Sequence, residues 1–211
     1  MEEKRKKLEE YKRALYIIDM NNGFVNFGAM ANPLYNKLVL EQRKVLESFR
    51  SDDELVNFIL EGHDKDAIEF EKYPAHCIKG TPEANLIPEF FNEQENNNTR
   101  IYYKNSINGM LNRDLQDDIC NMKNLQEVVF GGVCADLCVM DFARTYSRFL
   151  DEINKKAKLF VVKSTIDTFD APDHNKEEWM DIALKVMAQA GIEIVEKATD
   201  LENRERELKL R

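Results

Sequence analysis

Short apolar runs alternate with segments of helical spacing along the chain, and this alternation limits the folds that it can adopt. Most runs are rich in Val, Ile, Phe or Tyr and lack polar alternation, which is typical of strands buried on both faces. The runs span residues 14–18, 55–60, 101–103, 128–133, 159–162 and 192–195. Segments with apolar residues at helical spacing span residues 34–49, 115–122, 135–150 and 176–190. This order predicts an α/β fold, a three-layer αβα sandwich around a mainly parallel, doubly wound sheet.

The length of 211 residues fits one domain with a full core. No internal repeat and no linker rich in Pro, Gly or Ser divides the chain, so we predict a single domain over residues 1–211. Both ends are dense in charged residues, and we expect solvated helical extensions at about 1–13 and 201–211. These extensions could pack against a second copy in a homo-oligomer.

Acidic residues outnumber basic ones, 39 to 30, which gives a formal charge of −9. An acidic chain repels phosphate backbones and anionic lipids, so we expect neither nucleic acid nor membrane as a partner. No apolar run approaches the roughly 20 residues that span a bilayer. The first 13 residues also lack the apolar core of a secretory signal. The four cysteines therefore indicate a cytoplasmic protein with free thiols rather than a disulfide scaffold.

Polar and reactive side chains follow four of the predicted strands. In an open parallel sheet the ligand crevice lies beyond the carboxyl ends of the strands. Taken singly, each of these residues is explained as a turn residue, a cap or a solvated strand end. Their convergence on one edge of the sheet favours a functional site. They are Asp19, Glu61 with His63, Lys104, and the thiols Cys134 and Cys138.

The segment GGVCADLCVMDFART leaves a strand through two glycines and enters a helix. A thiol at Cys138, in the first turn of that helix, would be favoured as thiolate by the helix dipole. A nearby Lys104 would lower its pKa further, Asp19 could accept the proton, and backbone amides of the turn could hold an oxyanion. Taken alone, Cys134 and Cys138 are better explained as small buried core residues. Their spacing is only a weak signal for zinc.

Two of the three histidines lie in one short acidic segment. His63 and His76, together with Glu61 and Glu69, could form a site for Zn²⁺, Mn²⁺ or Fe²⁺. The alternation Glu-x-His at a strand end directs both side chains to one face. A charged loop that carries histidines by chance explains the pattern equally well. His174, in the segment APDHN, lies in a predicted loop and is given no role.

Together these motifs resemble the isochorismatase-like cysteine hydrolases, and within them the nicotinamidases. The resemblance extends from about Leu15 to Val195. The last of its four motifs is the most specific. The motifs are IIDMNNGFV, EGHDKDAIEF with YPAHCIKGTPEANL, YYKNSINGM and GGVCADLCV.

The resemblance implies a catalytic triad. It gives Asp19 the role of general base, Lys104 that of the residue that stabilises the thiolate, and Cys138 that of nucleophile. The family has a cis peptide bond at the Val133–Cys134 position. The backbone amides of Cys134 and Cys138 would then form the oxyanion hole.

The resemblance also implies a substrate pocket and a metal site. Phe24 and Tyr73 would border the substrate. Glu61 stands where the family usually has Asp, and Glu69 stands where many members have His. The implied metal ligands are Glu61, His63, Glu69 and His76.

The implied activity is hydrolysis of nicotinamide to nicotinate and ammonia through a thioester on Cys138, a step of NAD salvage. One divalent ion per chain, zinc before manganese or iron, would bind the pyridine nitrogen. Two alternatives stay open. One is an amidase for an N-carbamoyl or ureido substrate, since such enzymes share the triad but lack the metal segment. The other is a non-catalytic binding member. Isochorismatases proper lack the nucleophilic cysteine, so Cys138 argues against that branch.

Overall fold

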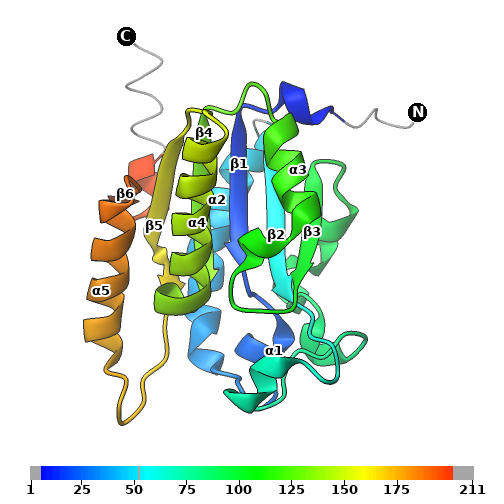
Figure 1. The fold of residues 1–211 in the computed structure, drawn as a ribbon, viewed down its shortest axis with the longest axis vertical. Helices are drawn as coiled ribbons and strands as arrows, with labels where there is room; N and C mark the ends of the chain where they lie inside the picture. Colours follow the sequence, from blue (N-terminus) through cyan, green and yellow to red (C-terminus); the bar gives the residue numbers. More distant parts are fainter. Residues whose placement is uncertain (1–5, 52, 202–211) are drawn as a thin grey trace.

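Six strands, all paired in parallel, form the central sheet of the computed structural model (Figure 1). The structure describes residues 6–51 and 53–201. The strand order is β3-β2-β1-β4-β5-β6, so the chain starts near the middle of the sheet and builds outward in both directions. Each predicted run overlaps one strand, which confirms the mainly parallel sheet. The strands are β1 (Arg13–Ile18), β2 (Leu55–Glu61), β3 (Thr99–Lys104), β4 (Glu127–Val133), β5 (Lys158–Asp167) and β6 (Glu193–Val195).

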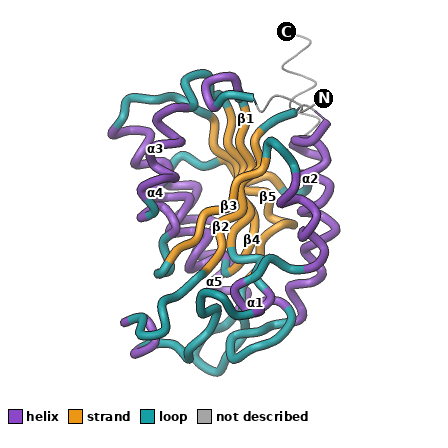
Figure 2. The backbone as a smooth tube through the Cα atoms, turned by 90° about the vertical axis from the view of Figure 1, so that its right-hand side faces the viewer, coloured by secondary structure: helices purple, strands orange, loops and turns teal. Residues whose placement is uncertain are grey.

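Helices cover both faces of this sheet. Figure 1 shows α3, α4 and α5 in front of the strands, and Figure 2 shows α2 on the opposite side. This arrangement confirms the predicted three-layer αβα sandwich. The α-helices are α1 (Asn22–Val25), α2 (Val39–Ser51), α3 (Arg113–Asn121), α4 (Met140–Glu152) and α5 (Lys176–Gln189).

Two predicted helices begin in another helical form. The segment predicted over 34–49 starts as the 3₁₀-helix Pro33–Leu38 and continues as α2. The segment predicted over 135–150 starts as a single π-turn, Ala135–Val139, and continues as α4. In that turn the Val139 amide donates to the carbonyl oxygen of Cys134, five residues earlier, at 3.0 Å. Widened turns of this type are frequent at functional sites.

Strand β1 shows why the apolar runs lack polar alternation. Ala14, Tyr16 and Ile18 belong to the core cluster that packs under α3, α4 and α5. Leu15 and Ile17 point the other way, into the cluster that packs under α2. Because successive side chains of a strand alternate between the two faces, a strand covered on both sides must be apolar throughout.

The predicted N-terminal helical extension over 1–13 is wrong for its described part. Leu8–Glu10 forms one 3₁₀ turn, and β1 already begins at Arg13. The Arg13 backbone amide donates to a Glu54 carboxylate oxygen at 3.0 Å, and its guanidinium donates to Glu127 at 2.9 Å. These contacts with the two neighbouring strand regions hold the chain extended.

The predicted C-terminal extension over 201–211 lies outside the described residues from residue 202 onward. Within residues 6–51 and 53–201, no helix has both the length and the apolar character needed to cross a bilayer.

Gly132 lets β4 approach the end of β1 closely. The pairing of β4 with β5 shifts in register between Phe130 and Gly132, and Gly132 has a φ of +121°. A Cβ at this position would lie 2.0 Å from the carbonyl oxygen of Ile18, which no side chain permits. Because glycine has no side chain, the turn after β4 can lie next to Asp19, the residue that follows β1.

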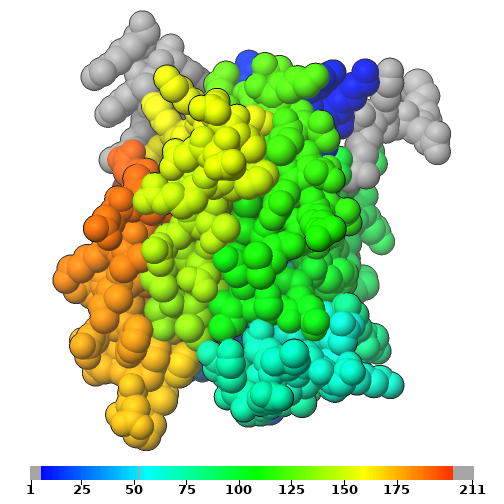
Figure 3. All heavy atoms as spheres, in the orientation of Figure 1, coloured from blue at the N-terminus to red at the C-terminus, as the bar shows by residue number. Residues whose placement is uncertain are grey.

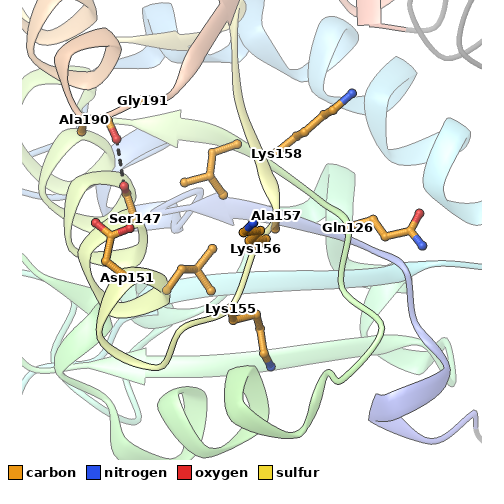
Figure 4. A pocket seen from close by; sticks show the side chains of 11 residues that line it. Gln126, Ser147, Asp151, Lys155, Lys156, Ala157, Lys158, Ala190 and Gly191 are labelled. Atoms are coloured by element: carbon orange, nitrogen blue, oxygen red, sulfur yellow. Dashed lines mark hydrogen bonds between the residues drawn. The ribbon is translucent and has the colours of Figure 1, made fainter.

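A hollow of about 590 Å³ lies at the amino-terminal edge of the sheet, near the starts of β4 and β5 (Figure 4). Its polar groups serve the fold. The Lys155 ammonium donates to the carbonyl oxygens of Ile119, Cys120 and Met122 at 2.5–3.1 Å and so caps α3. The side chains of Lys155 and Lys158 point away from each other, so the hollow does not bring its cations together.

Candidate active site

The carboxyl ends of four adjacent strands bring the predicted catalytic side chains together. In the order β3, β2, β1 and β4, these strands place Lys104, Glu61, Asp19 and the turn of Cys138 side by side. Lys104 is also the register partner of Glu61. The loops at this edge gather below the sheet in Figure 2, and Figure 3 shows part of the segment after β2 in cyan. The site therefore lies at the reversal of strand order between β1 and β4, where open α/β sheets bind ligands.

Lys104 is the centre of a buried polar cluster. Its ammonium nitrogen lies 2.9 Å from Oδ2 of Asp19, 2.6 Å from Oε1 of Glu61 and 3.7 Å from Sγ of Cys138. All four side chains are buried. One carboxylate oxygen of Asp19, one of Glu61 and Sγ of Cys138 lie within 4.8 Å of one another. An acid, an ammonium and a thiol thus meet within proton-transfer reach of each other.

Burial and charge set the protonation of Asp19 and Lys104. Burial raises the pKa of Asp19 to about 7, against the opposing charge of Lys104. Burial lowers the pKa of Lys104, but the neighbouring Asp19, Cys138 and Glu61 raise it overall to well above its usual range. Asp19 can therefore gain and lose a proton near neutral pH, while Lys104 stays charged.

The expectation that the helix dipole and Lys104 lower the pKa of Cys138 is not met. Burial, together with the charges of Asp19 and Glu61, raises the pKa of Cys138 well above its usual range, and Lys104 only partly offsets this. The thiol also lies in the π-turn before α4 rather than in the first turn of an α-helix. Cys138 is therefore protonated at rest and needs a base when it attacks.

The four implied metal ligands converge into a second group, which we call the four-donor cluster. One ligand atom from each lies within 4.8 Å of the others. Three of the four are buried and the remaining one is half-buried. Two imidazoles with two carboxylates are a donor set that suits Zn²⁺, Mn²⁺ or Fe²⁺. The cluster consists of Glu61, His63, Glu69 and His76.

The histidines of this cluster are oriented as metal ligands usually are. Nδ1 of His76 donates to the carbonyl oxygen of Pro74 at 2.7 Å, and Nδ1 of His63 lies 3.3 Å from Oδ1 of Asn105. Such contacts fix the tautomer whose Nε2 carries a lone pair. Both Nε2 atoms face Oε2 of Glu61, at 2.6 Å from His76 and 3.0 Å from His63. Two ring nitrogens and a carboxylate oxygen thus converge on one point, where either a proton or a divalent cation would satisfy them, so the residues fit a bound divalent ion.

Glu61 belongs to both groups. Its Oε2 faces the imidazoles, and its Oε1 lies 2.6 Å from the Lys104 ammonium and 4.0 Å from Sγ of Cys138. Burial raises the pKa of Glu61, but Lys104, His63 and His76 hold it well below its usual range. The residue predicted only as a metal ligand is thus also an ion-pair partner of the predicted catalytic lysine.

Glu61, Glu69 and His76 of the four-donor cluster line one cavity together with Cys138. Its volume is about 590 Å³, a size typical of small-molecule sites. Phe24 and Tyr73 line it as the resemblance implies, and Phe24 contacts His76 edge-on with ring centres 5.3 Å apart. Cys134 and Cys138 both line the cavity, and the Val133–Cys134 peptide bond is cis, as the resemblance implies.

Sequence reasoning missed two walls of this cavity. One is formed by the segment 29–35, which includes Met30 and Tyr35, and the other by Phe169 and Asp170 after β5. Neither segment carries a motif with a recognisable spacing. Both become wall residues only because the loops after β1 and β5 end at the same edge of the sheet.

The fold and the site together are those of a hydrolase built on a parallel α/β sheet. The chain belongs to the isochorismatase family, since the model of the isochorismatase domain matches residues 13–199.

Known relatives include amidases with different substrates. The chain is 30% identical over 175 residues to nicotinamidase 1 of Arabidopsis thaliana, covering 76% of this chain and 71% of that protein. It is 26% identical to N-carbamoylsarcosine amidase of Thermoplasma acidophilum, with a TM-score of 0.70 over 89% of this chain and 96% of that one. A pyrazinamidase of Pyrococcus horikoshii in complex with zinc is 23% identical, with a TM-score of 0.68 over 88% of this chain and 99% of that one.

Proposed function

We propose that this protein is a nicotinamidase, which hydrolyses nicotinamide to nicotinate and ammonia in NAD salvage. The observation that carries the proposal is that Cys138 and three members of the four-donor cluster, Glu61, Glu69 and His76, line the same cavity. A carbamoyl or ureido hydrolase needs the triad alone, whereas a pyridine amide also offers a ring nitrogen for a metal ion. The 30% identity to a nicotinamidase supports this substrate. We also propose a cytoplasmic location for the protein.

In the proposed first half-reaction, Cys138 attacks the carboxamide carbon while its proton moves to Asp19. Lys104 stays protonated beside both groups, so it holds Asp19 in place and stabilises the negative charge that passes through Sγ. The backbone amides of Cys134 and Cys138 stabilise the oxyanion. Asp19 then gives its proton to the leaving nitrogen, the C–N bond breaks, and ammonia departs.

In the second half-reaction, a water molecule attacks the thioester carbon and gives a proton to Asp19. The C–S bond breaks, the proton returns to Sγ of Cys138, and nicotinate leaves. Phe24 and Tyr73 border the ring in both steps. The same acid–base residue serves both halves because its pKa lies near 7.

The four-donor cluster would hold one divalent ion per chain, zinc before manganese or iron. When bound, this ion would take the pyridine nitrogen as a ligand and so fix the ring. The Pyrococcus pyrazinamidase contains zinc, which supports a metal in this fold.

Protein reloaded with zinc is expected to release ammonia from nicotinamide, and to act much more slowly on N-carbamoyl and ureido compounds of similar size. The reason is that only the pyridine amide engages both the triad and the four-donor cluster. A coupled ammonia assay on the three substrate classes measures this. Release from the carbamoyl compounds alone would reject nicotinamide as the substrate and identify the alternative amidase.

Wild-type protein is expected to bind one zinc ion per chain, and His76→Ala is expected to lose it. Loss of a residue that only hydrogen-bonds to a metal ligand lowers metal affinity about 10–100-fold, and loss of a direct ligand such as His76 should lower zinc affinity by more. Equilibrium dialysis with elemental analysis measures the stoichiometry. His174→Ala is the matched control, since this histidine lies outside the cluster, and it should keep the ion. A His76→Ala protein that retains one equivalent would contradict the site.

Below pH 7, kcat/KM is expected to fall about tenfold per pH unit, and to level off above it. Asp19 must be deprotonated to accept the thiol proton, and burial raises its pKa to about 7, so its active fraction declines as pH falls. The pKa values of Lys104 and Cys138 are raised, so neither group changes its protonation between pH 5 and 8 or alters the slope of the pH–rate profile there. Initial rates across this range measure the decline of kcat/KM. Bound metal is measured at each pH to exclude loss of the ion. A flat profile would rule out Asp19 as the base.

A further inference from the structure

Asp136 is a buried carboxylate that the proposed mechanism does not use. It lies between Cys134 and Cys138, and its side chain is only 1% exposed. Its Oδ2 lies 2.8 Å from Nε2 of His174, and its Oδ1 accepts a hydrogen bond from the Thr168 hydroxyl. The turn that presents Cys138 is therefore tied to the loop after β5 through both oxygens of one side chain.

His174 contacts its own loop, helix α5 and Asp136 of the turn before α4. Its Nδ1 donates to the carbonyl oxygen of Phe169 at 3.1 Å, while its Nε2 faces Asp136. Its ring stacks on that of Phe169, with centres 3.9 Å apart and planes at 13°. It also stacks on the ring of Trp179, with centres 5.0 Å apart and planes at 1°. Two polar contacts and two ring contacts therefore fix one imidazole.

The tip of this loop is exposed, so packing into the core does not fix its position, and the contacts of His174 do. Ala171, Pro172 and Asp173 are exposed, and the segment projects at the lower edge of the molecule (gold in Figures 1 and 3). Two hydrogen bonds of 3.0 Å between Ala171 and His174 close its tip. Yet Phe169, two residues before Ala171, lines the same cavity as Cys138.

We propose that His174 is a positioning residue, which holds Phe169 as a wall of the substrate cavity and ties that wall through Asp136 to the turn of Cys138. The inference rests on the proposed function for the identity of the substrate but not for the geometry. Since Phe169 contacts the substrate rather than the reacting bond, loss of His174 acts on binding and raises KM more than it lowers kcat.

The kinetic test compares His174→Ala, Phe169→Ala and the double variant in ammonia release from nicotinamide. Each single variant is expected to raise KM about five- to tenfold, the value of one aromatic contact, with kcat nearly unchanged. The double variant should be no worse than Phe169→Ala, because both substitutions remove the same wall. His174→Phe, which keeps the stack, should rescue KM in part. Asp173→Asn, in the exposed tip of the loop, is the matched control. Additive effects, or a fall in kcat at constant KM, would overturn the proposal.

A second measurement needs no substrate. Iodoacetamide should alkylate Cys138 faster, relative to the exposed Cys120, in His174→Ala and in Phe169→Ala, by similar factors that do not multiply in the double variant. Mass spectrometry of the two peptides reads this ratio. If wild-type protein releases no ammonia from nicotinamide, the proposed function fails and this measurement alone decides on His174. Unchanged labelling in His174→Ala would then refute its positioning role.

Discussion

Replacement of Cys138 by alanine is expected to reduce ammonia release from nicotinamide by about 10⁶-fold, the loss seen when a covalent nucleophile is removed. The reason is that no other described group can form the acyl intermediate. Cys134 also lines the cavity, but burial raises its pKa to about 12, and its side chain contacts the Tyr35 hydroxyl. The fold should survive, since a small buried side chain replaces another. Steady-state assays and the melting temperature measure the two effects.

The matched control is Cys134→Ala, which keeps the backbone amide assigned to the oxyanion hole and removes only the thiol. It should retain activity within about tenfold, since a single removed side-chain contact costs about 1.4 kcal/mol or less. Acid quenching during turnover should also trap a nicotinoyl adduct on the Cys138 peptide of the wild type. Full activity in Cys138→Ala, or an adduct on Cys134, would exclude the proposed nucleophile.

Replacement of Lys104 by methionine is expected to destabilise the fold by about 3–5 kcal/mol as well as to abolish activity. Lys104 is buried and lies within 3 Å of two buried carboxylates, those of Asp19 and Glu61. Methionine fills similar space but leaves both carboxylates without their cation. Urea unfolding at pH 8 measures the loss as a change in midpoint at constant slope.

Acid should reverse part of this loss. Without Lys104, the folded-state pKa of Asp19, which burial already raises to about 7, rises further, and Glu61 loses the charge that lowers its pKa most. The variant therefore loses stability relative to wild type as pH rises. The deficit of the variant relative to wild type should therefore shrink from pH 8 to pH 5. Lys123→Met, which removes an exposed pair with Glu9, should cost at most about 1 kcal/mol at either pH. A Lys104→Met deficit that does not change with pH would show that lost packing, rather than unpaired charge, is the cause.

The sequence predicts the sheet because its strands are buried on both faces. Residues 14–18 and 128–133 are apolar at every position for that reason, so their lack of alternation identifies them. The extent of β5 is less predictable. Its second half, Lys163–Asp167, carries exposed and polar residues that continue the strand past the apolar run, and only pairing with β4 shows this.

The sequence also predicts which side chains share one edge, but not how they pair. Asp19, Glu61 and Lys104 each follow or end an apolar run, which places them at the carboxyl edge of a parallel sheet. The ion pair between Glu61 and Lys104 depends on the register of β2 against β3, which no local pattern fixes. The raised pKa of Cys138 depends on burial and on the charges of Asp19 and Glu61, which lie at the ends of other strands, so its direction could not be foreseen from helix position alone.

The contact between Asp136 and His174 is a second pairing that the sequence does not predict. The two residues lie 38 positions apart, one in a motif and one in a loop without a motif. Only the adjacency of β4 and β5 brings their loops together. A carboxylate inside a recognised motif suggests a part in the chemistry of that motif, whereas the partner of Asp136 is a histidine outside every motif.

Glu61 belongs both to the four-donor cluster and to the polar cluster around Lys104, so no substitution of Glu61 alters one cluster alone. Its Oε2 faces the imidazoles while its Oε1 contacts the Lys104 ammonium. A substitution at this position therefore cannot be interpreted as a defect in ion binding alone, because it also alters the environment of the nucleophile. Effects of substitutions at positions 61 and 104 on activity should therefore be strongly non-additive.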